Sequence, residues 1–172
     1  MVKKFNQLNE KLKLNHYNMN NIVYFCINDR ALDVLITLIY QDIIDKKNFQ
    51  EIVDNFTDFL FTEEGEDYTD LDKVYDLIEI MIEKGFDVNT RKNNVNDKVT
   101  IIELVASIED EEYKYKMIDL LMKNGMKITP TIGGYIEEDA WNGYNAFKYI
   151  EENYPKEIKD YIKSKQVKKF KI

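Results

Sequence analysis

The spacing of the apolar residues is the feature that most constrains the fold of this 172-residue chain. Over most of its length they recur three and four positions apart, as at Leu71, Val74, Leu77 and Ile78. This spacing places side chains on one face of an α-helix, whereas alternation at every second residue is nearly absent. Glycine and proline together number only eight, too few for a turn-rich β fold. The chain is predicted to be an all-α, single domain over residues 1–172.

Short and long helices are predicted to alternate along the chain. Phe5, Leu8 and Leu12 share one helical face, so residues 1–20 are expected to form a helix that caps one end of the fold. Turn signals such as Asn28-Asp29 and Gly133-Gly134 separate the later helices. The expected helices cover residues 22–27, 32–43, 49–60, 71–82, 101–107, 110–125, 135–141 and 145–153, with a last helix opened by Pro155 and an acidic loop at 63–70.

Two of the long helices end in a similar sequence. Ile82-Glu83-Lys84-Gly85 and Met122-Lys123-Asn124-Gly125 both place a glycine where a left-handed residue closes a helix. Aligning the long helices on their terminal apolar residues gives spacings of 43, 40 and 28 residues. The residues aligned are Ile39, Ile82, Met122 and Ile150. These spacings lie in the range of stacked helix-pair repeats.

Residues 74–153 resemble divergent ankyrin repeats. Segment 77–89 is similar to the family's long-helix ending and the glycine, aspartate and asparagine turn that follows it. Segment 100–106 is similar to the short-helix opening, and segment 118–125 repeats the long-helix ending. Segment 140–150 looks like a further helix pair.

The resemblance is incomplete, and it implies a specific organisation. Ile101 and Glu103 stand where the family usually has proline and histidine. The resemblance is also weaker before residue 62. It implies about four ankyrin-like helix pairs over residues 21–155, stacked in an array, with a basic C-terminal helix and tail at 156–172. A generic helical repeat or an irregular helical bundle is the alternative, and both are all-α.

The charge is unevenly distributed. Residues 15–155 carry a formal charge of −16, whereas residues 1–14 and 156–172 carry +3 and +5. An acidic body repels phosphate backbones and steers basic partners toward itself. Only Arg30 and Arg91 supply the guanidinium groups that usually read guanine edges. No direct nucleic-acid binding is expected, and the expected partner is a protein with a basic surface.

The single cysteine and the hydropathy of the chain indicate in which cellular compartment the protein is expected. Cys26 is the only cysteine, so no intramolecular disulfide can form, and its apolar neighbours predict a buried side chain. No apolar stretch approaches the roughly 20 residues that span a bilayer. The Lys-rich start leads into Asn9 and Glu10 rather than an apolar signal segment. A cytoplasmic protein with no membrane segment is expected.

No residue pattern predicts catalysis. His16 is the only histidine, which excludes clusters of histidine ligands and a His/Asp relay. Ser107 and Ser164, the only serines, do not lie in a glycine-flanked elbow. The acidic residues 63–67 lack the ligand spacing of a calcium loop. The chain is therefore not expected to be an enzyme or to hold a metal or cofactor.

Protein binding is the function that these features favour. Stacked repeats expose extended surfaces suited to macromolecular recognition. The resemblance implies that turn tips and short-helix faces hold the partner. Transferred by position, the candidate partner-binding residues are Asn93, Asn94, Asn96, Asp97, Asp110, Glu111, Glu138, Asp139, Trp141 and Tyr144. Solvated turns, and acids that favour a helix dipole, would explain most of the same residues without a partner.

A dedicated inhibitor is the alternative function. An immunity or anti-defence protein of this kind would cover the basic nucleic-acid channel or active site of a nuclease or toxin. Small size, one domain and the −16 body permit it, and electrostatic complementarity would make the capture of the target fast.

Overall fold

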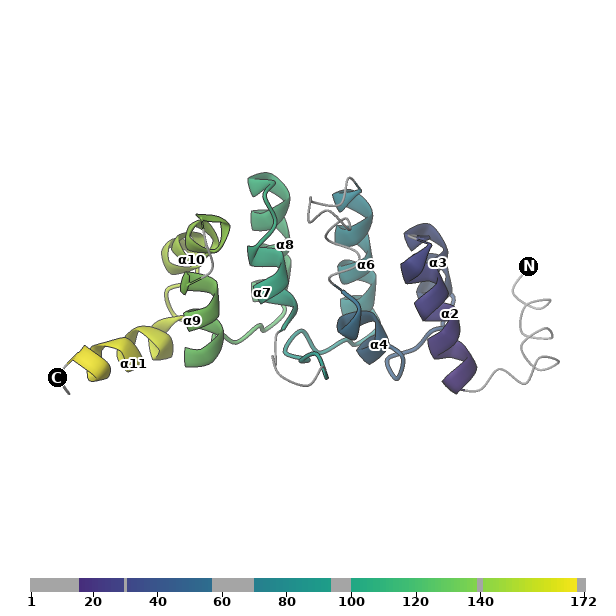
Figure 1. The fold of residues 1–172 in the computed structure, drawn as a ribbon, viewed down its shortest axis with the longest axis horizontal. Coiled ribbons are helices and arrows are strands. Elements are labelled where there is room, and N and C mark those ends of the chain that lie inside the picture. The colour runs from purple at the N-terminus through teal and green to yellow at the C-terminus, as the bar shows by residue number, and fades with distance from the viewer. Residues whose placement is uncertain (1–15, 30, 57–69, 94–99, 139–140, 170–172) are drawn as a thin grey trace.

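The regular structure of the protein is helical. The computed structural model describes residues 16–29, 31–56, 70–93, 100–138 and 141–169, and within these ranges every regular element is an α-helix (Figure 1). The prediction of an all-α fold is confirmed. The helices are α2 (His16–Asn28), α3 (Leu32–Tyr40), α4 (Phe49–Asp54), α6 (Leu71–Glu83), α7 (Ile101–Ala106), α8 (Glu111–Lys123), α9 (Pro130–Glu138), α10 (Trp141–Asn153) and α11 (Lys159–Lys169).

The helices lie in two layers along the long axis of the molecule. α3, α6, α8 and α10 contact one another in chain order and form one layer. In the other layer α2 contacts α4 and α7 contacts α9. Contacts between α2 and α3, between α7 and α8 and between α9 and α10 join the layers, and α11 packs against α9 at the C-terminal end (Figure 1).

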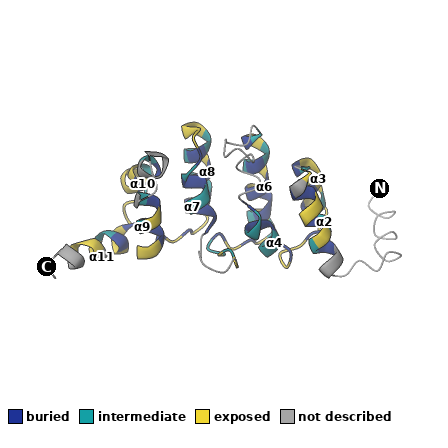
Figure 2. Cartoon of the chain, viewed as in Figure 1, coloured by how far each residue is buried: buried dark blue, intermediate teal, exposed yellow. Residues whose placement is uncertain are grey.

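One apolar core runs through both layers, from Val23 in α2 to Tyr161 in α11. Each helix contributes the residues that its period places on one face, and Figure 2 shows the buried and exposed sides of the helices. In α6, for example, Val74, Leu77 and Ile78 are fully buried. The helical period of the apolar residues in the sequence therefore marks the face that each helix buries.

Three helices of the first layer close in the same way. The residue after the C-cap is left-handed each time, with φ of 57° at Asp42, 87° at Gly85 and 88° at Gly125. This confirms the predicted role of both glycines, and it adds Asp42, which carries no glycine signal. In each case the next N–H reaches back five residues, which satisfies an end carbonyl of the helix. These bonds join Ile43 N to Leu38 O (2.9 Å), Phe86 N to Met81 O (2.9 Å) and Met126 N to Leu121 O (3.1 Å).

Alanine at either closing glycine should destabilise the fold. A Cβ at Gly85 or Gly125 would meet nothing within 4 Å, so any cost comes from the backbone conformation alone. An L-residue in the left-handed region costs about 1 kcal/mol or slightly more. We expect Gly85→Ala and Gly125→Ala each to lower the free energy of unfolding by about that amount, measured by urea denaturation. An unchanged urea midpoint would contradict this account of the closures.

The prediction of a turn at Gly133-Gly134 is wrong. α9 begins at Pro130 and continues through both glycines. The reason lies in packing, because a Cβ on Gly133 would lie 2.6 Å from Cγ of Tyr161. Glycine at this position lets the Tyr161 ring approach the α9 backbone, and α9 remains helical.

Several predicted helix boundaries also change. The helix predicted over 32–43 ends at Tyr40, because Asp42 is left-handed. The helix predicted over 22–27 begins earlier, at His16, where Asn20 accepts a hydrogen bond from the Asn48 side chain (2.8 Å) and so joins α2 to α4. α4 ends at Asp54, and residues 57–60 of the predicted helix lie outside the described residues. So do residues 1–15 and 63–69.

The last two helices begin elsewhere than predicted. The helices predicted over 135–141 and 145–153 leave residues 142–144 as a turn, but α10 starts at Trp141 and runs through them, so it includes both Trp141 and Tyr144. Burial of Ala146 and Ile150 on one face favours the helix over the turn-forming Asn142-Gly143 sequence. Pro155 does not open the last helix, because residues 155–158 form a turn and α11 begins at Lys159.

Candidate functional site

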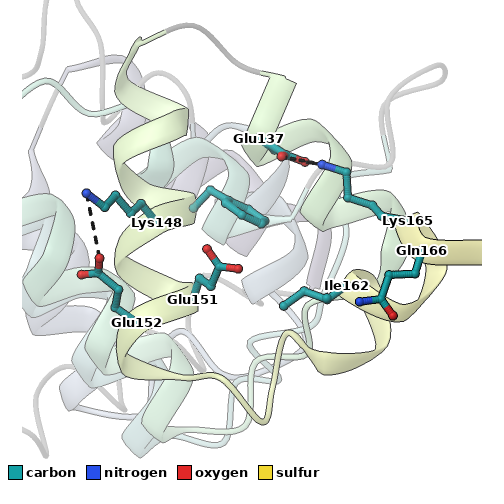
Figure 3. Close-up of a pocket in the computed structure, with 8 residues that line it drawn as sticks. Glu137, Lys148, Glu151, Glu152, Ile162, Lys165 and Gln166 are labelled. Carbon is teal, nitrogen blue, oxygen red and sulfur yellow. Dashed lines mark hydrogen bonds and ion pairs between the residues drawn. The ribbon is translucent and has the colours of Figure 1, made fainter. Parts of the chain in front are cut away.

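A hollow of about 430 Å³ lies between α10 and α11, with one residue from α9 at its edge (Figure 3). We call it the C-terminal groove. It is open to solvent and combines charged side chains with an apolar wall. Its lining residues are Glu137, Phe147, Lys148, Glu151, Glu152, Ile162, Lys165 and Gln166.

Glu137 joins α11 to α9. Its carboxylate accepts hydrogen bonds from the Tyr161 hydroxyl and from the Lys165 ammonium group, which also forms an ion pair with it. Burial alone would raise the pKa of Glu137, but these two hydrogen bonds outweigh it and leave the pKa below its ordinary value. Both partners of Glu137 therefore favour its charged form, and they hold the first half of α11 in place.

Tyr161 fixes the position of α11 by its ring as well as by its hydroxyl. The ring lies directly over Gly133, where no Cβ intervenes. It also meets the Phe147 ring edge-on, at 5.5 Å between centroids and 76° between planes. Such aromatic pairs add to the stabilisation from area burial. The wall of the groove on the α11 side thus depends on one glycine and one tyrosine.

The charged groups on the α10 side of the groove have weaker interactions than Glu137 has. Lys148 and Glu152 form an ion pair at 3.9 Å, with side chains 61% and 62% exposed, and such pairs contribute little energy. Glu151 has no hydrogen-bond or ion-pair partner among the described residues, and its carboxylate projects into the space between α10 and α11 (Figure 3). This side of the groove therefore has negative charge that nothing described in the chain neutralises.

A second hollow, of about 330 Å³, adjoins the C-terminal groove and shares Lys148 and Glu152 with it. It lies between α8 and α10. The Asn145 amide of α10 donates to the Glu111 carboxylate of α8 (2.9 Å). The Tyr115 and Tyr149 rings stack beside them, 4.2 Å apart and 9° from parallel. The lining residues are Glu111, Tyr115, Asn145, Lys148, Tyr149 and Glu152.

Asp119 joins α8 to the end of α10 behind this hollow. Its Oδ1 accepts hydrogen bonds from the hydroxyls of Tyr149 (2.9 Å) and Tyr154 (2.8 Å), and Lys123 approaches Oδ2 at 3.2 Å. Burial opposes the charge of Asp119, but the two hydroxyls and Lys123 lower its pKa overall. Burial and the hydrogen bond to Asp119 raise the pKa of Tyr149 to about 12.

The structure describes several of the predicted partner-binding residues, and it places one of them at a hollow. Glu111 lines the second hollow. Asp110 precedes it and caps α8, with its side chain accepting from Tyr113 N at 3.1 Å. Glu138 is the last residue of α9, and Trp141 and Tyr144 lie at the start of α10.

Asn93 does not line either hollow. Asn93 N donates to the Asp54 carboxylate of α4 (2.7 Å), and its amide reaches the same side chain (3.3 Å). Gln50 of α4 also donates to the Arg91 carbonyl (2.9 Å), so the chain before residue 94 is tied to α4. The predicted residues that lie outside the described part of the chain are Asn94, Asn96, Asp97 and Asp139.

The sequence analysis missed the residues that line the C-terminal groove. Glu137 and Lys165 are 28 positions apart, and nothing local in the sequence links them. Lys165 lies in the predicted basic helix and tail at 156–172, where Ile158, Tyr161 and Ile162 supply a short apolar stripe that predicts packing. The four-residue spacing of Lys148 and Glu152 on a helix was the other available signal.

Within the described ranges, no three His, Cys, Asp or Glu side chains are placed to hold a metal ion. None of the described helices combines the length and the apolar character needed to cross a bilayer. No protein-family model, no curated protein and no solved structure matches the chain.

Proposed function

We propose that this protein is a protein-binding module built from ankyrin-like helix pairs, and that it holds a basic partner at its acidic surface. The C-terminal groove is the observation that carries the proposal. It is an open hollow with an apolar wall, and the Glu151 carboxylate in it lacks a partner among the described residues. Open hollows of this kind suit contact with another protein better than enclosure of a small substrate.

Two features support the ankyrin-like part of the proposal. The Asn89 side chain bridges successive turns, because its amide donates to the Gly125 carbonyl (3.1 Å) and its oxygen accepts from Lys127 N (2.9 Å). At the start of α7, Glu103 accepts from the backbone N–H (2.5 Å) and the hydroxyl (2.9 Å) of Thr100. Glu103 thus stabilises the short-helix opening where the family usually has histidine.

The charge of the long helices supports the basic partner. α6, α8 and α10 all expose carboxylates, and their common sign attracts cations before contact. Lysines on the same helices are fewer, and Lys116 lies over the Tyr75 ring at 4.1 Å. The exposed acids of these helices are Asp72, Asp76, Glu79, Glu83, Glu111, Glu112, Glu151 and Glu152.

Charge reversal with a matched control tests this function. The partner would first be purified by affinity capture with cross-linking and then produced alone. We compare Glu151→Lys/Glu152→Lys with Asp76→Lys/Glu83→Lys on α6, which changes the net charge equally at exposed positions. Both variants should slow association by a similar factor at low salt, because steering depends on the overall field. Only the groove variant should speed dissociation, by about tenfold, since it alone loses direct contacts.

Two outcomes of this comparison would count against the proposal. Equal dissociation rates for the two variants would place the contact outside the groove. Unchanged association rates for both would show that the acidic surface does not select the partner. Circular dichroism should first establish that both variants are folded.

The dedicated inhibitor is the narrower form of this function, favoured by the −16 charge of residues 15–155. It requires the captured partner to be a basic nuclease or toxin. Addition of one equivalent of this protein should then abolish cleavage by that partner, and the groove variant should restore it. A partner that keeps its activity in the complex would leave only the general binding function.

A further inference from the structure

We propose that the C-terminal groove takes one arginine side chain of the partner, with the guanidinium at Glu151 and the aliphatic part against Ile162 and Phe147. This inference rests on the proposed function and names the chemistry that the same site recognises. It requires an apolar wall, a carboxylate free to accept and a hollow of suitable size.

The apolar wall comes from two helices. Phe147 of α10 is 8% exposed and Ile162 of α11 is half-buried, and both line the hollow. Long cationic side chains commonly place their methylene groups on such a surface and keep the charged end at its edge. The volume of about 430 Å³ exceeds the needs of one side chain, and the opening lets a partner backbone pass outside.

The acceptors are on α10. Glu137 is already bound by Tyr161 and Lys165, so it is not available to a partner. Glu151 has no competing cation among the described residues, and Glu152 has only the long, exposed contact with Lys148. In Figure 3 the Glu151 carboxylate lies in the space between α10 and α11, whereas Glu152 is turned toward Lys148 on the other side of α10. The groove therefore offers one carboxylate, that of Glu151, beside its apolar wall.

Charge and hydration favour arginine over the other occupants. An anion would meet the Glu151 carboxylate, while Lys165, which lines the groove from α11, is already paired with Glu137. The ammonium group of lysine is strongly hydrated, so it loses more hydration free energy than a guanidinium when it enters a half-buried hollow. A guanidinium is more weakly hydrated and donates through a planar fork that matches carboxylates.

A peptide titration tests the inference on the full chain. The probe is acetyl-Ala-Arg-Ala-amide, with the citrulline peptide as its neutral isostere and the lysine peptide as the alternative cation. We expect millimolar binding of the arginine peptide, seen as amide shifts in α10 and α11 by nuclear magnetic resonance. Glu151→Gln should weaken it about tenfold, since a charge-assisted bond becomes a neutral one. Asp76→Asn removes the same charge from α6 and should change it little.

Loss of the α11 wall gives a second test that leaves the carboxylates intact. Gly133→Ala forces Tyr161 and α11 away and should abolish peptide binding, whereas Gly134→Ala, where a Cβ meets nothing within 4 Å, should preserve it. Equal binding of the arginine peptide and either comparison peptide would overturn the inference. So would an undiminished affinity in Glu151→Gln or in Gly133→Ala.

The outcomes separate this inference from the function on which it rests. A protein partner whose dissociation is faster in Glu151→Lys/Glu152→Lys, combined with no binding of the arginine peptide, would leave the binding module intact and reject the arginine site. The opposite result is that the protein captures no partner, yet it binds the arginine peptide and Glu151→Gln weakens that binding. This result would support the arginine site and reject the binding module.

Discussion

Replacing Asp119 by alanine is expected to lower the free energy of unfolding by about 2–3 kcal/mol. The carboxylate is the common acceptor of the Tyr149 and Tyr154 hydroxyls, so its removal leaves two half-buried donors without this partner. A hydrogen bond to a charged group contributes about 1.5–3 kcal/mol. Partial exposure of all three groups keeps the combined loss in the range that we expect. Urea denaturation followed by circular dichroism measures it.

Two variants of α8 serve as controls for Asp119→Ala. Asp119→Asn keeps an acceptor oxygen and should lose about half as much, because the bond is no longer charge-assisted. Lys123→Ala removes only a 67% exposed ammonium group and should change the stability by less than about 0.5 kcal/mol. Equal losses for Asp119→Ala and Lys123→Ala would mean that the hydroxyl contacts do not stabilise the fold.

The same network gives a dependence on alkaline pH. The pKa of Tyr149 is raised from 10.0 to about 12, so the folded chain keeps its proton where the unfolded chain releases it. Its contribution to stability is therefore complete below pH 10 and is lost as the pH rises toward 12. Asp119→Asn should let Tyr149 ionise at lower pH, which the ultraviolet absorbance of phenolate would report.

Gly133→Ala is expected to lower the free energy of unfolding by about 1–3 kcal/mol, the usual cost of overpacking. The new Cβ would lie 2.6, 2.8 and 2.9 Å from Cγ, Cδ2 and Cδ1 of the Tyr161 ring. These atoms belong to the base and body of a ring that also packs on Phe147, so it cannot turn aside easily. Relief of the clash requires α11 to move, which also separates Tyr161 and Lys165 from Glu137.

The neighbouring glycine is the matched control. Gly134 lies in the same helix, and a Cβ there meets nothing within 4 Å. Gly134→Ala should raise the free energy of unfolding by about 0.5–1 kcal/mol, the ordinary gain in a helix interior. The two substitutions are thus expected to have opposite signs. A stabilised Gly133→Ala variant would refute the close approach of Tyr161 to α9.

Local signals made much of the fold predictable from the sequence. The apolar stripe and Gly85 predicted α6 almost to its ends. Thr100 directly precedes the helix predicted over 101–107, and it caps α7 through the reciprocal contacts with Glu103. These features depend on residues within one or two helical turns of each other, which is why a single sequence contains them.

Features that depend on distant residues could not be predicted. Gly133 has the sequence signature of a turn, and only the Tyr161 ring, 28 positions away, explains its place inside a helix. Asp42 closes α3 without glycine, aided by an ion pair with Lys84, the C-cap residue of α6 (2.6 Å). The C-terminal groove likewise exists only because α11 returns to α9. Ile158, Tyr161 and Ile162 predict that the last helix packs against the fold, but nothing local in the sequence specifies α9 as the surface.

The docking of α11 has a thermodynamic consequence for whatever fills the groove. One wall belongs to α11, which packs against α9 and is held there by Tyr161 and Glu137, so detachment of α11 would remove the site. Occupancy and docking are then linked equilibria, and each must favour the other by the same free energy. A bound side chain would therefore stabilise the docked position of α11. A substitution that weakens the docking of α11 would in turn lower the affinity of the groove, even if the substituted residue does not contact the ligand.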